Sequence, residues 1–270
     1  MERLEGILGQ RVVSLEPLTG GCIAEVHRAD LDDGTSVVVK RGVHLDVEAY
    51  MLRELEDHLR VPRVVHAESD LLVMEHIAHD GRSSPEGEVE AADLLASLHD
   101  VTASTCGYER DTLIGPLPQA NPPTERWIPF FREHRLRVVA SRAVQAGRFE
   151  ASILDEIDRL PLDEILEEPD APSLLHGDIW GGNVLWDAGR VVAFIDPALS
   201  RGHPEIELAF IGMFQTFGAR FFERYHERRP IAPGYEERAM IYTLYPLLVH
   251  AHLFGHGYVA QVHGILRRYT

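Results

Sequence analysis

The pattern of apolar and polar positions in the first quarter of the chain predicts a small β-sheet. Runs rich in β-branched and aliphatic residues are separated by polar turns: VVSLEPL, CIAEVHRADL, TSVVVKRG, RVVHAE and DLLVMEHI. Asp33-Gly34 stands between the second and third runs, and this dipeptide is typical of a β-hairpin turn. One helix is expected between the third and fourth runs, because apolar residues recur there at helical spacing: Val47, Met51, Leu52, Leu55 and Leu59.

After the glycine- and charge-rich segment HIAHDGRSSPEGE, the periodicity becomes helical. EVEAADLLASLHDVT and TERWIPFFREHRLRVVASRAVQAG each predict a helix, and Gly147 is expected to cap the second. A third helix is predicted in EASILDEIDRLPLDEIL, with an interruption at Pro161. We therefore expect a two-lobed α+β fold, with a small β-rich lobe carrying one helix over residues 1–76, a hinge near residue 76, and a larger, mainly helical lobe over residues 77–270.

The charge balance limits the expected partners. The 270 residues include 43 acidic and 26 basic side chains, a formal net charge of −17, and such a surface repels nucleic acid and anionic membranes. Two cysteines are too few for a disulfide framework, the N-terminus lacks a signal peptide's apolar centre, and no run of about eighteen apolar residues occurs. We expect a cytoplasmic protein that binds neither nucleic acid nor membrane.

The segment LLHGDIWGGNVLW at residues 174–186 interrupts an apolar run with polar and small residues. It leads into a predicted hairpin, in which VLW is the outward strand, DAGR the turn and VVAFID the return strand. Asn183 precedes the outward strand and Asp196 ends the return strand, so we expect the two side chains to lie side by side. Asp178, five residues before Asn183, is expected on the loop that enters the hairpin.

Two oxygen-rich side chains beside a third carboxylate suit magnesium-dependent phosphoryl transfer. Mg²⁺ prefers hard oxygen ligands, which we assign to Asn183 and Asp196. A further carboxylate must orient the attacking hydroxyl and accept its proton, and this is the predicted role of Asp178. The spacing H-x-D-x-x-x-x-N with a later Asp matches a kinase catalytic loop. The alternative is that Asp178 is a turn residue and Asn183 a cap, but the hairpin context, the spacing and the later Asp favour catalysis.

The rest of an ATP site is predicted in the first lobe. Lys40 ends the third strand, where it would hold the nucleotide phosphates, and Glu48 lies one turn into the following helix, where it would pair with Lys40. The turn TGGCIAE would cover the phosphates through Gly20 and Gly21, although it is no full glycine-rich motif. Backbone groups around two further positions would hydrogen-bond adenine, namely Glu75 and Ile77. The alternative for Lys40 is that it is an exposed lysine at the edge of a strand. The alternative for the segment around Glu75 and Ile77 is that it is a buried edge strand.

Several longer segments resemble the fructosamine kinases, also called ketosamine-3-kinases: SLLHGDIWGGN, FIDPALSRGHPEIELAF, LIGPLPQANPPTERWIPFFREHRL and RFFERYHERRPIAPGYEERAMIYTLY. The resemblance implies a two-lobed protein-kinase-like fold and ATP-dependent phosphorylation of a sugar hydroxyl, at the 3-position, on a ketoamine such as a fructosamine or ribulosamine. The phosphorylated adduct then decomposes and frees the amine, so the implied role is protein deglycation.

The resemblance also implies roles for single residues. It makes Asp178 the catalytic base, Asn183 and Asp196 the metal ligands, and Lys40 with Glu48 the nucleotide-anchoring pair. Trp180 is suited to stack on the sugar, with plain packing as the alternative, and His203 is a second candidate for the acceptor site. The sequence departs from the family where Ser200-Arg201 replaces a common aromatic pair and where MFQTFG replaces a common glycine pair.

Three other interpretations stay open. Aminoglycoside and choline kinases share HGD and a later IDP, and the acidic surface suits their cationic acceptors. A nucleotide-binding pseudokinase is disfavoured, because such a protein would usually lose one of four residues that are all present: Lys40, Asp178, Asn183 and Asp196.

Cys22 in the glycine turn is either an oxidisable thiol of lowered pKa or a small buried hydrophobic residue.

Overall fold

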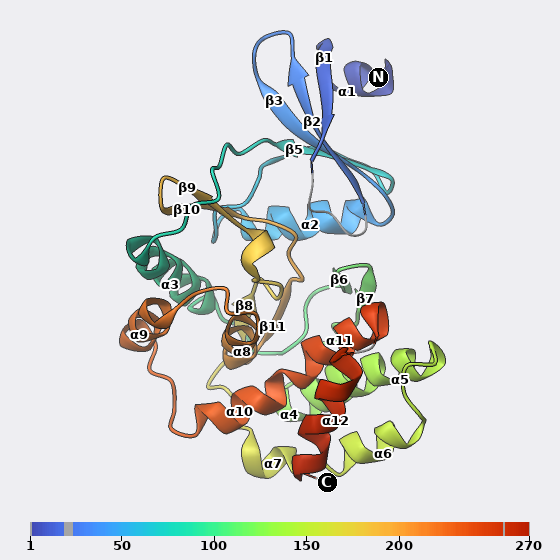
Figure 1. Cartoon of the computed structure of the whole chain (residues 1–270), viewed down its shortest axis with the longest axis vertical. Coiled ribbons are helices and arrows are strands. Elements are labelled where there is room, and N and C mark those ends of the chain that lie inside the picture. The colour runs from blue at the N-terminus through green and yellow to red at the C-terminus, as the bar shows by residue number, and fades with distance from the viewer. Residues whose placement is uncertain (1, 19–23, 256, 270) are drawn as a thin grey trace.

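A five-stranded antiparallel sheet forms the N-terminal part of the protein (Figure 1). The computed structural model describes residues 2–18, 24–255 and 257–269. The strands lie in the order β1-β2-β3-β5-β4, with these bounds: β1 (Val12–Pro17), β2 (Glu25–Leu31), β3 (Ser36–Arg41), β4 (Val64–Ala67) and β5 (Leu71–Glu75). All five were predicted, as was the helix α2 (Leu45–Leu55) beneath the sheet.

The short helix α1 (Glu2–Leu8) was not predicted. It packs on the outer end of the sheet through Leu4, which is buried in a cluster with Val12 and Ala29. The carboxylate of Glu5 accepts a hydrogen bond from the backbone N–H of Val12 at 2.9 Å, so this helix also fixes the start of β1.

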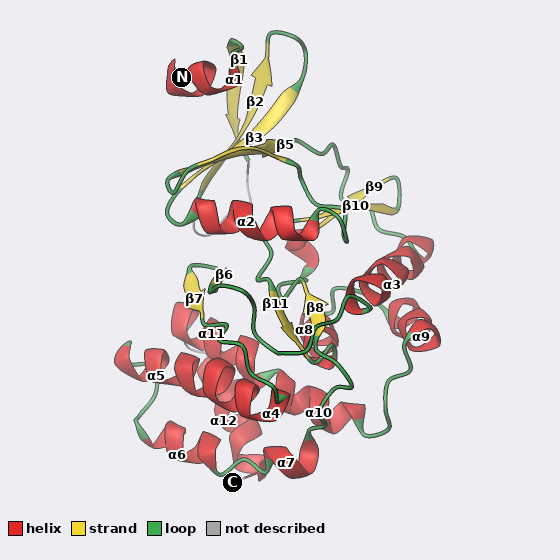
Figure 2. Ribbon diagram, turned by 180° about the vertical axis from the view of Figure 1, so that it is seen from behind, coloured by secondary structure: helices red, strands yellow, loops and turns green. Residues whose placement is uncertain are grey.

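The remainder of the chain is mainly helical (Figure 2). Its first long helix is α3 (Pro85–His99), and α4 (Trp127–Phe130), the π-helical η1 (Phe131–Arg137) and α5 (Val138–Gln145) follow as one continuous rod. The predicted stop at Gly147 and the predicted break at Pro161 are both confirmed, because Gly147 has φ +69° and Pro161 separates the next two helices. The remaining helices are α6 (Ser152–Asp158), α7 (Leu162–Ile165), α8 (Glu205–Phe214), α9 (Ala219–Arg228), α10 (Tyr235–Tyr242), α11 (Leu244–Phe254) and α12 (Gly257–Tyr269).

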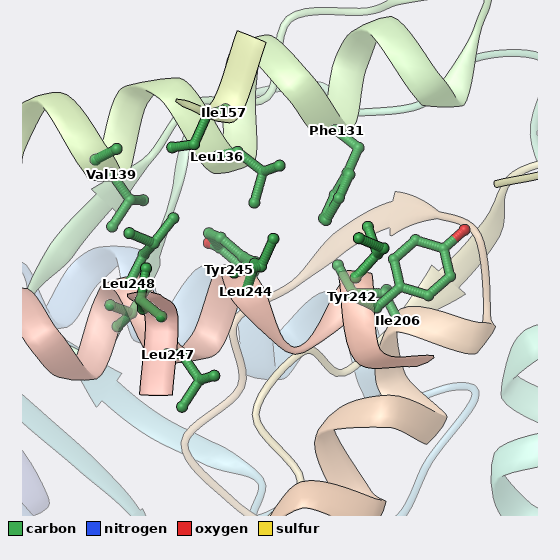
Figure 3. Close-up of a cluster of buried hydrophobic side chains, with 14 of the residues drawn as sticks. Phe131, Leu136, Val139, Ile157, Ile206, Tyr242, Leu244, Tyr245, Leu247 and Leu248 are labelled. Carbon is green, nitrogen blue, oxygen red and sulfur yellow. The ribbon is translucent and has the colours of Figure 1, made fainter. Parts of the chain in front are cut away.

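Two apolar clusters hold these helices in place. In the first, Phe131 and Leu136 on η1 face Tyr242 and Leu244 of α10 and α11 (Figure 3). The second joins α2 to α3, since Leu52 and Leu95 belong to the same buried cluster. Full burial of one such leucine contributes roughly 1.5–3 kcal/mol, so this shared cluster stabilises the attachment of the sheet and α2 to the helical part.

Three strand pairs lie between the sheet and the helices. β8 (Ser173–Leu175) pairs with β11 (Ser200–Gly202), and β6 (Thr112–Ile114) pairs with β7 (Leu117–Gln119). β9 (Val184–Asp187) and β10 (Arg190–Phe194) form the predicted hairpin. Its turn residues Ala188 and Gly189 both have positive φ, as a tight two-residue turn requires. In the described part of the chain, no helix is both long and apolar enough to cross a membrane.

Candidate active site

The loop His176-Gly177-Asp178 leaves β8 and is held by the segment that enters β11. The backbone N–H of Ala198 donates to the carbonyl of His176 at 2.7 Å. Gly177 has φ +86°, and a Cβ at this position would overlap the carbonyl oxygen of Ala198. Both the conformation and the close approach require glycine, so the loop has one permitted path past Ala198.

Asp178, Asn183 and Asp196 lie together at the end of the β9–β10 hairpin. The side-chain Nδ2 of Asn183, in the short 3₁₀ turn η2 (Gly181–Asn183), donates to the carbonyl of Asp178 at 2.8 Å and to its Oδ2 at 3.1 Å. The N–H of Ile195 donates to the carbonyl of Asn183 at 3.0 Å, which places Asp196 beside it. The structure therefore brings together three of the side chains singled out from the sequence.

The environment of Asp178 favours a carboxyl group that can hold a proton near neutral pH. Burial, followed by the charge of Asp196 and more weakly that of Glu207, raises the pKa of Asp178 to about 7, although the hydrogen bond from Asn183 acts in the opposite direction. A group with a pKa near 7 is suited to accept a proton from a hydroxyl at physiological pH.

Lys40 is buried between two carboxylates. Its Nζ lies 2.7 Å from Oε1 of Glu48 on α2 and also contacts Oδ1 of Asp196, while its side chain is 7% exposed. Burial by itself would lower the pKa of Lys40, but the charges of Asp196 and Glu48 outweigh it and raise that pKa above its usual value. Lys40 is thus a permanent cation that links the sheet, α2 and the catalytic loops.

The remaining nucleotide-site candidates fall on two segments. Glu75 ends β5, its carboxylate lies 3.2 Å from the guanidinium of Arg60, and its backbone N–H donates to the carbonyl of Arg63 at 2.8 Å. Ile77 follows it and is buried, and its carbonyl lies 3.0 Å from Nδ1 of His79. The other segment, with Gly20, Gly21 and Cys22, lies outside the described residues.

The two acceptor-site candidates differ in exposure. Trp180 precedes η2 and is 41% exposed, with its ring lying over Gly182. His203 is only 9% exposed, its Nδ1 accepts the backbone N–H of Glu205 at the start of α8, and its ring packs beside Tyr242. Nδ1 of His203 is therefore already engaged within the protein, whereas the ring of Trp180 is open to solvent.

One buried charge at this site was not singled out from the sequence. Glu207 on α8 is 2% exposed, and one of its carboxylate oxygens accepts the backbone N–H of Gly177. The only sequence signal was a glutamate within the apolar run EIELAF, where an acidic side chain must be buried if the helix is packed on both sides.

Comparisons with known proteins agree with this geometry. A family model described as fructosamine kinase matches residues 4–270. Ketosamine-3-kinase of Mus musculus is 32% identical over 290 residues, covering 92% of each chain. The chloroplastic protein-ribulosamine 3-kinase of Oryza sativa subsp. indica is 31% identical over 280 residues, covering 96% of this chain and 79% of the relative.

A solved structure also matches nearly the whole chain. The crystal structure of a protein from Thermobifida fusca, described as a "putative fructosamine-3-kinase", superposes with a TM-score of 0.88. It is 30% identical and covers 98% of this chain and 96% of its own. The two-lobed protein-kinase-like fold expected from the sequence is therefore confirmed.

Proposed function

This chain belongs to the fructosamine kinase family, and we propose that it transfers the γ-phosphoryl group of ATP to a sugar hydroxyl of a ketoamine. The relatives named above as ketosamine-3-kinase and protein-ribulosamine 3-kinase support the 3-hydroxyl as the acceptor position. The observation that carries the proposal is the meeting of Asp178, Asn183, Asp196 and the Lys40–Glu48 ion pair at one place. Deglycation of proteins is the corresponding biological role.

In this proposal the ATP phosphates contact Lys40, which Glu48 holds at the inner end of β3. An ammonium buried at 7% exposure interacts with phosphate more strongly than a solvated one, because little water screens it. The adenine lies against the end of β5. Glu75 can offer only its backbone carbonyl there, since its N–H is bonded to Arg63, and Ile77 supplies the neighbouring backbone group.

The donor set fits a magnesium ion. Asn183 donates to Asp178 through Nδ2, which leaves Oδ1 as its acceptor atom, and Asp196 presents a carboxylate that is 42% exposed. Hard amide and carboxylate oxygens are the ligands that Mg²⁺ prefers. When bound, the ion would supply positive charge that neutralises the negative charge developing on the phosphates. Asn183 and Asp196 would hold it there.

Asp178 would act on the acceptor. Its carboxylate orients the sugar hydroxyl and accepts the proton as the oxygen attacks phosphorus. The bond from Asn183 fixes one carboxylate oxygen, so the other remains for the hydroxyl. Trp180, exposed two residues further on, offers an aromatic face on which the sugar can stack. We leave His203 out of this acceptor site because of its burial.

We further propose that the chain divides functionally near residue 76, with residues 1–76 holding the nucleotide and residues 77–270 carrying catalysis and the acceptor. β5 ends at Glu75 and the next helix begins at Pro85, so an extended segment joins the two parts.

An ATP-consumption assay over a panel of acceptors tests the proposed function. We expect turnover with N-fructosyl and N-ribulosyl derivatives of lysine, and none with choline or kanamycin-like aminoglycosides. Robust aminoglycoside turnover, with no turnover of any ketoamine, would overturn the proposal.

A further inference from the structure

A line of three buried polar side chains leads from the helices to the catalytic loop. Tyr225 lies on α9, His99 ends α3 and Glu207 lies in the first turn of α8. The exposed fractions of these side chains are 2% or less. The three helices lie near one another, with α3 and α9 on the same side of α8 (Figures 1 and 2).

Hydrogen bonds join the three side chains to one another and to the catalytic loop. The hydroxyl of Tyr225 lies 2.6 Å from Nδ1 of His99, and Nε2 of His99 lies 2.8 Å from Oε2 of Glu207. A carboxylate only accepts, so Nε2 of His99 is the donor in its hydrogen bond to Glu207. The other oxygen of Glu207, Oε1, accepts the N–H of Gly177.

Glu207 stays ionised despite its burial. Burial by itself would raise its pKa, but the hydrogen bond and charge of His99, with smaller contributions from His176 and the Gly177 amide, lower it. A buried carboxylate is costly to keep, and removing one of its partners leaves an uncompensated charge. One oxygen of Glu207 is hydrogen-bonded to the imidazole of His99 on a helix, and the other accepts the loop amide of Gly177. The carboxylate therefore connects the helices to the loop.

The bond to Gly177 acts one residue before Asp178. The carbonyl of His176 is fixed by Ala198, and the side chain of Asp178 is fixed by Asn183. Glu207 holds the N–H side of that same peptide group, between His176 and Gly177, whose carbonyl side is held by Ala198. A shift of that peptide would turn the Asp178 carboxylate relative to an acceptor, and small misplacements of catalytic groups reduce rates strongly.

We propose that Tyr225, His99 and Glu207 are positioning residues, which hold the backbone of Gly177 and through it aim the carboxylate of Asp178. The effect on turnover rests on the proposed role of Asp178, whereas the effect on the Gly177 peptide does not.

The variant that tests the far end of the line is Tyr225→Phe, which removes a single hydroxyl. Tyr242→Phe is its matched control, because Tyr242 is also buried and its hydroxyl also makes a buried hydrogen bond, with Nε1 of Trp127 at 3.0 Å. We expect Tyr225→Phe to lower kcat about three- to tenfold with an unchanged KM for ATP, the range for losing one hydrogen bond. Tyr242→Phe should leave kcat unchanged.

A spectroscopic measurement tests the same line without any acceptor. Labelling histidine carbonyls and glycine amides selects three His–Gly pairs in this chain, which are His176-Gly177, His256-Gly257 and His263-Gly264. A charge-assisted hydrogen bond should move the Gly177 amide proton downfield, and Glu207→Gln should return it upfield because the amide oxygen is a weaker acceptor. Tyr225→Phe should move it in the same direction by less, and Tyr242→Phe should not move it.

These outcomes separate the positioning role from the proposed function. A Gly177 amide that moves in Glu207→Gln and Tyr225→Phe supports the positioning line even if no ketoamine is phosphorylated by the unaltered protein. The proposal is overturned if Tyr225→Phe leaves the Gly177 amide where it was, or if its kcat falls no further than that of Tyr242→Phe.

Discussion

The ammonium of Lys40 contacts the carboxylates of both Glu48 and Asp196, so a single cation joins β3, helix α2 and the loop after β10. β3 and α2 follow one another in the sequence, but Asp196 lies 156 residues beyond Lys40. Their meeting places a metal-ligand candidate and a phosphate-binding candidate at the same point, and several predictions depend on it.

Replacing Lys40 should remove most of the activity. Lys40→Met leaves Glu48 as a buried carboxylate without its cation and removes the proposed phosphate contact, so kcat/KM for ATP should fall by roughly two orders of magnitude or more. Arg41→Met is the matched control, because Arg41 is the next residue of β3 and its side chain is exposed. Steady-state kinetics at varied ATP measures both. Equal activity in the two variants would contradict a nucleotide role for Lys40.

The two active-site aspartates should fail in different ways. Asp178→Asn should bind magnesium-ATP nearly as well as the unaltered protein, with turnover reduced on the order of 10²–10⁴-fold by loss of the general base. Asp196→Asn should lose turnover and also bind magnesium-ATP more weakly, because a charged oxygen ligand is gone. Titration calorimetry beside single-turnover rates distinguishes them. Weaker nucleotide binding in Asp178→Asn alone would show that the roles are reversed.

Gly177 should not tolerate a side chain. Gly177→Ala forces a positive φ on alanine and drives its Cβ into the carbonyl of Ala198, at a cost of at least about 1–3 kcal/mol. Gly181→Ala is the control, since no atom lies within 4 Å of a Cβ there. Urea unfolding and turnover should both be impaired in the first variant and nearly normal in the second. A fully active, stable Gly177→Ala protein would contradict the described path of the loop.

The neutral, buried His203 predicts acid sensitivity. Burial, with the positive charges of Arg238 and Arg229 and the nearby His99, lowers the pKa of His203 to about 3, whereas an unfolded histidine titrates near 6.5. At pH values between about 3 and 6.5, His203 is protonated in the unfolded chain but not in the folded protein. The free energy of unfolding therefore falls as the pH drops from about 6.5 toward 3, by at most about 1.4 kcal/mol per pH unit from this residue.

His203→Gln should flatten this dependence, and His58→Gln, on an exposed position, should not. Urea unfolding at a series of pH values between 7 and 4 measures the slopes. At pH 8, His203→Gln should keep its KM for the acceptor, consistent with a residue that supports α8. A large rise in that KM would return His203 to the acceptor site.

Structural features that depend on neighbouring residues could be predicted from the sequence, whereas those that depend on contacts between distant residues could not. The β9–β10 hairpin and the break at Pro161 follow from neighbouring residues, so local patterns predicted them. Helix α1 has seven residues with one of them buried, and β6 and β7 have three residues each, too few for a periodic pattern. Glu207 was missed for a different reason. Its partners Gly177 and His99 lie 30 and 108 residues away, and no local pattern reports such contacts.

The most direct test of the central claim is a ³¹P NMR measurement of the product formed from ATP and an N-fructosyl or N-ribulosyl lysine derivative. The account predicts ADP together with one new phosphate monoester on the sugar, formed by the unaltered protein and almost undetectable with Asp178→Asn at the same enzyme concentration. Two results would contradict it: a monoester that forms equally fast in Asp178→Asn, or phosphate that stays on ATP with every ketoamine and moves to an aminoglycoside.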